Sequence, residues 1–334
     1  MMTLFIPKFL VDLKGKVLLL KNIQIMKKRF LLCTALLSCT IMARAQKPDT
    51  AQVLVHYKFS HIRDTTNREH PYTENMVLIV GKNAGVYKSY DKQLQDALFK
   101  KQVQEQVANS PDGHVNIQRR SSGSGTDYYQ FPNGKKLARK EPLLFNSYLI
   151  TDALPAIEWK ISGDTATFGG LNCQKATGHF KGRDYTAWFS PDLLLHIGPW
   201  KLNGLPGVIV EAYDTKKEVY FKFDGIEKAV ISPQKGDDQP TGPAPDNQGR
   251  MAVIIGMDDQ VGDPNIIQLP TNAIKTTEKE FSKLQEAMRK DPNAFAQSMV
   301  ATQAASQGRP APKIDIRIGP QPVINNPIEL PEKK

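Results

Sequence analysis

Cysteine is scarce in this sequence of 334 residues, which contains only three. Cys33 and Cys39 lie near the start of the chain, and Cys173 lies alone in its middle. A lone cysteine cannot form an internal disulfide, so a small disulfide-stapled domain is excluded. Stability has to come from a hydrophobic core, for which a hydrophobic fraction of 40% is sufficient.

Recognisable catalytic and metal-binding motifs are also missing. The six histidines form no H-E-x-x-H pattern, no pair of C-x-x-C motifs exists, and no G-x-S-x-G nucleophile elbow is present. We therefore predict no catalytic residues, no metal and no cofactor. A site assembled from residues far apart in sequence remains the alternative, a periplasmic hydrolase or metal-binding enzyme that uses His56, His61, His179 and Cys173.

The formal net charge of +10 does not indicate a nucleic-acid partner. Residues 1–45 contain eight of the 44 Lys and Arg residues but only one of the 34 Asp and Glu residues. The other 36 positive and 33 negative side chains differ by only 3 charges. Since most of the excess charge belongs to the start of the chain, we predict no basic patch on the folded part and no nucleic-acid binding.

Residues 26–45 have the pattern of a secretory signal peptide. Three basic residues at 27–29 precede an uncharged run, and Ala43-Arg44-Ala45 is a small-residue cleavage site. The run is shorter than the roughly 20 residues of a membrane-spanning helix, so we predict cleavage after Ala45 and no transmembrane helix beyond it. Residues 1–25 are then an upstream, non-native extension. Lipidation at Cys39 is the less favoured alternative.

Hairpins dominate the rest of the chain. Alternating apolar residues predict strands over residues 51–65 and 74–91 and over most of 128–230, with no βαβ alternation. Helices are expected over residues 91–110, with Asp91 as the N-cap, and over 277–304, with a break at Pro292. Turns are expected at 83–85, 132–134, 181–183 and 215–217. The predicted class is α+β, mostly β: a large curved, half-barrel-like antiparallel sheet with about two packed helices.

The predicted domain covers residues 46–304. Its composition includes a polar stretch at 110–127, expected to be a mobile loop, and a Pro-, Gly- and Asp-rich stretch at 232–250, expected to be a disordered loop. Residues 305–334 are expected to form a Pro-rich, extended tail with a short strand at 314–318.

The stretch Gly204-Leu205-Pro206-Gly207 resembles a phosphate cradle at first sight. A strand, not a helix, is predicted to follow it, and Pro206 removes a backbone donor, so a turn is the better interpretation. Pro206 and Gly207 fit the central positions of a type II turn. Three aromatic residues precede it, and they belong either to the core or to an apolar ligand-binding groove: Trp188, Phe189 and Trp200.

Residues 169–214 resemble the signature of the GLPGLI family of exported Bacteroidetes proteins. The resemblance rests on Gly169-Gly170, Cys173/Lys175/Ala176, Gly182/Arg183/Tyr185/Ala187/Trp188/Phe189, Gly198/Pro199 and Gly204 to Ile209, with Val208 in place of the leucine of the name. Weaker agreement extends to residues 51–65, to the helix after Asp91 and to 325–330. The resemblance implies export and a β-rich fold but transfers no catalytic residues. The sheet is also similar to those of periplasmic lipoprotein carriers, an analogy at the level of fold.

These observations lead to one expected function. We expect an exported protein of the cell envelope, periplasmic or associated with the outer membrane, that is not an enzyme. Its curved sheet would bind an apolar ligand, a lipid or an envelope protein partner. The aromatic residues and the absence of catalytic motifs motivate this hypothesis.

Overall fold

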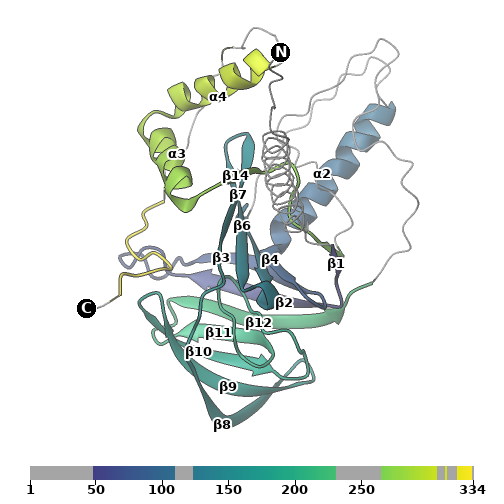
Figure 1. The fold of residues 1–334 in the computed structure, drawn as a ribbon, viewed down its shortest axis with the longest axis vertical. Coiled ribbons are helices and arrows are strands. Elements are labelled where there is room, and N and C mark those ends of the chain that lie inside the picture. The colour runs from purple at the N-terminus through teal and green to yellow at the C-terminus, as the bar shows by residue number, and fades with distance from the viewer. Residues whose placement is uncertain (1–47, 110–122, 231–264, 307–312, 314–321, 333–334) are drawn as a thin grey trace, which may run out of the picture. The chain divides into compact units, whose positions relative to one another are not determined.

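The structure is a computed structural model that describes residues 48–109, 123–230, 265–306, 313 and 322–332. Residues from Pro48 onward form one compact unit (Figure 1). The predictions for residues 1–25, 26–45, 232–250 and 314–318 lie outside the described residues, as does most of the predicted loop at 110–127.

One large sheet of twelve strands dominates this unit, in the order β14-β7-β6-β5-β4-β3-β2-β12-β11-β10-β9-β8. Every neighbouring pair is antiparallel except β14 and β7. The strands are β2 (Val53–His61), β3 (Tyr72–Val80), β4 (Gly85–Ser89), β5 (Asp127–Phe131), β6 (Lys136–Leu143), β7 (Asn146–Ala153), β8 (Trp159–Phe168), β9 (Leu171–Phe180), β10 (Arg183–Ser190), β11 (Val208–Asp214), β12 (Val219–Lys228) and β14 (Ile274–Thr276). The predicted mostly β, α+β class is confirmed.

The connection from β7 to β8 shows that the sheet is bent. These strands lie ten steps apart in the sheet order, which is about 48 Å in a flat sheet at about 4.8 Å per step. Only five residues, 154–158, join them, and such a segment spans roughly 20 Å at most. The two ends of the sheet must therefore approach each other, and Figure 1 shows β6 and β7 upright while β9 to β11 run across the view.

Both faces of the central strands are buried. Alternate residues of a strand point to opposite faces, and in β3 Leu78 belongs to one hydrophobic cluster while Val77 and Ile79 belong to another. The first cluster contains the inward side chains of β2, β10, β11 and β12. The second is covered in part by a small ribbon of β1 (Asp49–Thr50) and β13 (Ile266–Ile267). Burial on both faces explains the unbroken apolar run of β3.

Three helices are found in the described residues. They are α2 (Tyr90–Asn109), α3 (Glu278–Lys290) and α4 (Pro292–Ser306), so the break at Pro292 is confirmed. The predicted N-cap of α2 was wrong: the Ser89 hydroxyl accepts the Lys92 N–H, and Asp91 instead accepts two hydrogen bonds from Asn75. α3 places Phe281 against β7 in a third, smaller cluster.

The hairpin turns follow the sequence closely, with two corrections. Gly85 was predicted to lie in the turn at 83–85, but it is the first residue of β4. Lys181 and Gly182 alone connect β9 to β10, both with positive φ (51° and 69°), as a two-residue hairpin requires. Arg183 was predicted to belong to this turn, but it is the first residue of β10. Its side chain is consequently fixed by the sheet instead of lying at a turn tip.

Candidate functional site

The loop of residues 191–207, between β10 and β11, packs into the interior of the bent sheet. Its apolar side chains Ile197, Leu202 and Leu205 are fully buried in the first cluster. Gln130 of β5 is also fully buried, and its side-chain N–H group donates to the carbonyl oxygens of Gly198 and Trp200, both at 2.9 Å. The chain itself therefore fills this face.

The Gly204 to Gly207 stretch forms turns, though not the predicted type II turn. The Gly207 N–H donates to the Leu205 carbonyl at 2.7 Å, which is a γ-turn centred on Pro206. Gly207 has φ +152°, and a Cβ there would lie 2.1 Å from the Ser190 carbonyl oxygen. Close approach to β10 is the reason for glycine at this position.

The three aromatic residues predicted as ligand-binding lie in two environments. Phe189 and Trp200 are buried in the core, where Trp200 stacks on Phe221 with ring centroids 6.4 Å apart. Trp188 is half-buried and contacts Phe168, with 5.8 Å between ring centroids. Two of the three side chains thus lie in the core, which is one of the two alternatives that the sequence left open.

The structure does not bring the four scattered polar candidates together. His56 and His61 are five residues apart on β2, so they face opposite sides of the sheet about 17 Å apart along the strand. His56 contacts Glu227, and His179 contacts Asp184 and Glu332. Burial raises the pKa of the Cys173 thiol to about 11, so a thiolate is disfavoured. The described residues contain no cluster of three or more potential metal ligands.

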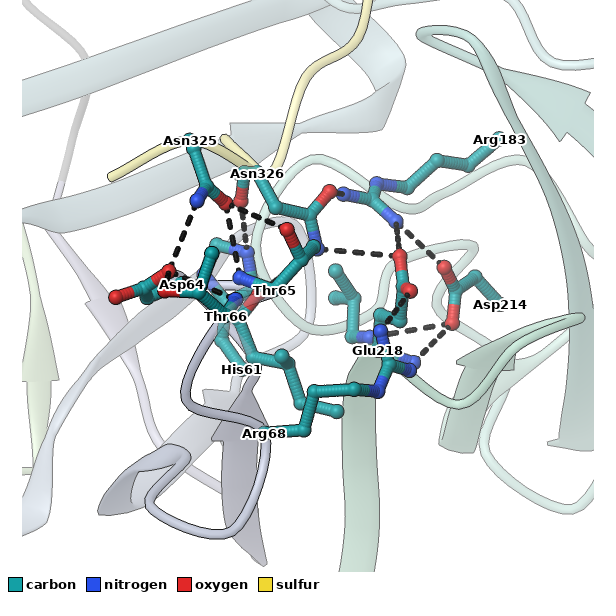
Figure 2. Close-up of polar contacts among 12 residues, drawn as sticks. His61, Asp64, Thr65, Thr66, Arg68, Arg183, Asp214, Glu218, Asn325 and Asn326 are labelled. Carbon is teal, nitrogen blue, oxygen red and sulfur yellow. Dashed lines mark hydrogen bonds and ion pairs between the residues drawn. The ribbon is translucent and has the colours of Figure 1, made fainter. Parts of the chain in front are cut away.

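A different polar site lies where residues 322–332 cross one end of the sheet. We call these residues the strap; they have no helix or strand structure. They cross a group of side chains that we call the cradle, shown in Figure 2: His61, Arg68, Arg183, Asp214 and Glu218. The cradle comes from β2 and the loop after it, from the start of β10, and from the hairpin between β11 and β12.

Arg183 lies at the centre of the cradle with only 3% of its side chain exposed. Its Nη1 donates to Asp214 at 2.6 Å and to Glu218 at 3.4 Å. Its Nη2 donates to the Asn326 side chain at 2.7 Å, and Nη2 and Nε donate to the carbonyls of residues 327 and 328 at 2.8 and 2.9 Å. All five N–H donors of the guanidinium are thus used, three of them by the strap.

The charges in the cradle balance. Two cations, Arg183 and Arg68, face two carboxylates, Asp214 and Glu218. Burial alone would raise the pKa of Glu218, but hydrogen bonds from Arg68, Asn326 and Arg183 outweigh it and hold the pKa below its usual value. The other Asp214 oxygen accepts the backbone N–H groups of residues 218 and 219, which fixes the hairpin. Glu218 therefore remains ionised, and the oxygens of both carboxylates are engaged in hydrogen bonds.

Asn326 is the residue of the strap that the cradle binds most completely. Its side-chain amide donates to the Ile62 carbonyl at 2.7 Å and to Glu218 at 3.1 Å, and its backbone carbonyl accepts from His61 Nε2 at 2.8 Å. Burial is the main reason why the pKa of His61 is lowered to about 4. His61 is therefore neutral near pH 7, and a neutral imidazole can still donate its Nε2–H to the Asn326 carbonyl. A side chain of another shape at position 326 would leave several buried polar groups without a hydrogen-bond partner.

The other end of the strap is held by ion pairs. Glu329 contacts Lys201 and, at 3.3 Å, Lys181. Glu332 accepts from His179 Nε2 at 2.7 Å, while His179 Nδ1 lies 2.6 Å from Asp184. Hydrogen bonds to these two carboxylates raise the pKa of His179, and the hydrogen bond from His179 lowers the pKa of Glu332. The acidic strap residues Glu329 and Glu332 thus lie against basic residues beside the cradle. We call these basic residues the cradle rim: His179, Lys181 and Lys201.

Sequence reasoning missed this site because its parts are far apart in the chain. His61 and Asn326 are separated by 265 residues, and no local pattern connects them. One signal could have indicated the site: Arg183, at the start of a strand, and the Asn-Asn-Pro stretch of residues 325–330 are both parts of the family resemblance. Nothing local indicated that these two parts meet.

Comparison with known proteins adds little to this geometry. No protein-family model and no curated protein matches the sequence. Solved structures of PNGF-II in space groups P21 and C2 align with 55% of this chain at 11% and 13% identity, with TM-scores of 0.38 and 0.37. The aligned parts amount to 30% and 29% of those chains. These similarities are too slight to assign a fold or an activity.

Proposed function

We propose that this protein is a non-enzymatic binding protein of the cell envelope and that its ligand is an extended protein segment bound at the cradle. One observation carries the proposal: three of the five N–H donors of Arg183 are directed at an extended segment, two of them at backbone carbonyls. Backbone and side-chain contacts of this kind are how proteins recognise extended peptides.

Of the three ligand classes expected from the sequence, a protein partner fits the geometry best. The interior face that an apolar ligand or a lipid would need is occupied by the loop of residues 191–207. The cradle, in contrast, is polar, charged and matched to a polypeptide. No helix of the described residues has the length and apolar character needed to cross a membrane.

Export and membership of the GLPGLI family are part of the same proposal. The compact unit begins at Pro48, just beyond the predicted cleavage site after Ala45, which supports a leader that is removed. Sequencing the N-terminus of the protein from its own cells tests this. We expect Gln46 as the first residue, and an intact leader or a lipid on Cys39 would contradict it.

Site-specific photo-crosslinking tests the binding function. A photoreactive residue replaces Lys181, which is half exposed at the cradle rim, and in a control it replaces Lys290 on α3, which is 71% exposed. We expect a protein adduct in cells from position 181 and not from 290, mapped by mass spectrometry to an extended segment of this or another chain. Lipid adducts alone, or equal adducts at both positions, would contradict the proposal.

A further inference from the structure

We propose that the strap is exchanged between copies, so that the cradle of one molecule binds residues 322–332 of a second copy. This inference rests on the proposed function, because it names the partner of the same cradle. The occupant is defined by the contacts of Arg183, Asn326 and Glu329. The second copy carries the same strap and satisfies every one of them.

The strap is bound by contacts that do not depend on chain connectivity. It has no strand pairing with the sheet, and it is held at two places, around Asn326 and around Glu329 and Glu332. Its partners come from β2 and the loop after it, from β9, β10 and the turn between them, from the turn between β11 and β12, and from the loop of residues 191–207. An identical segment from another molecule would make the same hydrogen bonds and ion pairs, which is the condition for low-cost exchange of an element between protomers.

The cradle also requires an occupant. Without the strap, three N–H donors of Arg183 lose their protein acceptors and are left to water. Asp214 and Glu218 stay with Arg183, so the site keeps its shape and charge. An emptied cradle therefore favours rebinding of a strap, whether from its own chain or from a neighbour.

The tether is long enough for either arrangement. Fifteen residues, 307–321, connect the end of α4 at Ser306 to the strap, and such a length spans up to about 50 Å. A tethered segment has an effective concentration on the order of millimolar, so its own strap occupies the cradle in dilute solution. Exchange becomes substantial when the protein concentration approaches that value.

Zero-length crosslinking of the unaltered protein tests this. Full chains of natural and of ¹⁵N composition are mixed in urea, refolded together at 20 µM and at 1 mM, and treated with a carbodiimide, which joins the Lys201 amine to the Glu329 carboxylate. We expect same-isotope crosslinks at 20 µM. At 1 mM we expect about half of the cradles to hold a strap from another molecule, so that mixed-isotope crosslinks rise to roughly a quarter of the total, against half for complete random exchange.

Two controls make every outcome informative. The Lys290 and Glu286 pair, one turn apart within α3, must stay same-isotope at both concentrations, which excludes collisional crosslinking. Glu329→Gln must abolish the Lys201 crosslink, whereas Glu332→Gln must retain it. Same-isotope crosslinks alone at 1 mM overturn the exchange and leave the proposed function intact. Absence of the Lys201 to Glu329 crosslink at both concentrations would overturn both.

Discussion

Replacing Arg183 should destabilise the protein more than any other single change at the cradle. In Arg183→Met the aliphatic stem is largely kept, but Asp214 and Glu218 lose a buried cation and the strap loses three hydrogen bonds. Breaking a buried ion pair by removing one partner costs about 3–5 kcal/mol, because the remaining charge is left without compensation. We expect a loss of that size in the free energy of unfolding.

Arg68→Met is the matched control. Arg68 pairs with Glu218 as Arg183 does, but 47% of its side chain is exposed, and solvent-exposed ion pairs contribute at most about 1 kcal/mol. Denaturant unfolding followed by tryptophan fluorescence gives both values. A loss for Arg183→Met that is no larger than the loss for Arg68→Met would refute the argument that burial gives Arg183 its importance.

A double-mutant cycle separates the strap from the ion pairs. Asn326→Ala alone removes the hydrogen bond to Arg183 and those to Ile62 and Glu218. If the cradle and strap act as one network, the double variant Arg183→Met with Asn326→Ala is less destabilised than the sum of the single variants, by about 0.5–3 kcal/mol. Additive losses would show that the strap is not energetically coupled to Arg183.

Three further changes test other parts of the structure. Gly207→Ala should destabilise the protein by more than the roughly 1 kcal/mol of an unfavourable φ, because the new Cβ would clash with the Ser190 backbone. In the control Gly134→Ala the new Cβ meets open space, so the denaturation midpoint should change little. Gln130→Leu leaves two buried carbonyls unpaired and should cost about 2 kcal/mol or more in denaturant unfolding, with a smaller loss contradicting the role of this amide. In an NMR titration the pKa of His179 should lie above 6.5 and fall in Glu332→Gln; an unchanged midpoint would contradict the ion pair.

The sign of the His179 effect defines the pH range in which this end of the strap is held. The folded-state pKa of His179 is raised above 6.5, so its contribution is complete below pH 6.5 and is lost as the pH rises through the folded-state pKa. The pKa of Glu332 is lowered below 4.5, so its contribution is complete above pH 4.5 and is lost as the pH falls. The contact is therefore strongest between about pH 4.5 and 6.5, and it is small because both groups are exposed.

The strands and their turns could be predicted from the sequence because their signals are local. Alternating residues mark β2, and a glycine able to adopt positive φ marks the turn at Gly182. The helix break at Pro292 is likewise local. Where a neighbour in space decided the outcome, the prediction failed: Ser89 caps α2 because Asp91 is engaged by Asn75 of β3.

The candidate site could not be predicted for the same reason. The sequence left Trp200 open between core and groove because its burial depends on Gln130 and Phe221, which are distant in sequence. The strands β1, β13 and β14 are two or three residues long and exist only because another segment lies beside them. Sequence alone therefore predicted the parts of the sheet, but not the closure of its interior or the partners of the strap.

The long separation between the cradle and the strap has a consequence for the rate of folding. β2 can pair with β3 as soon as both leave the ribosome, but its other edge waits for β12, some 165 residues later, and His61 waits for Asn326. Contacts between such distant residues form slowly, because loop closure has to precede any stabilisation. During that time β2 presents an open edge on which other chains can pair. A chain interrupted before residue 322 would keep Arg183 with three unpaired donors, so nascent chains are most open to misassembly before the strap arrives.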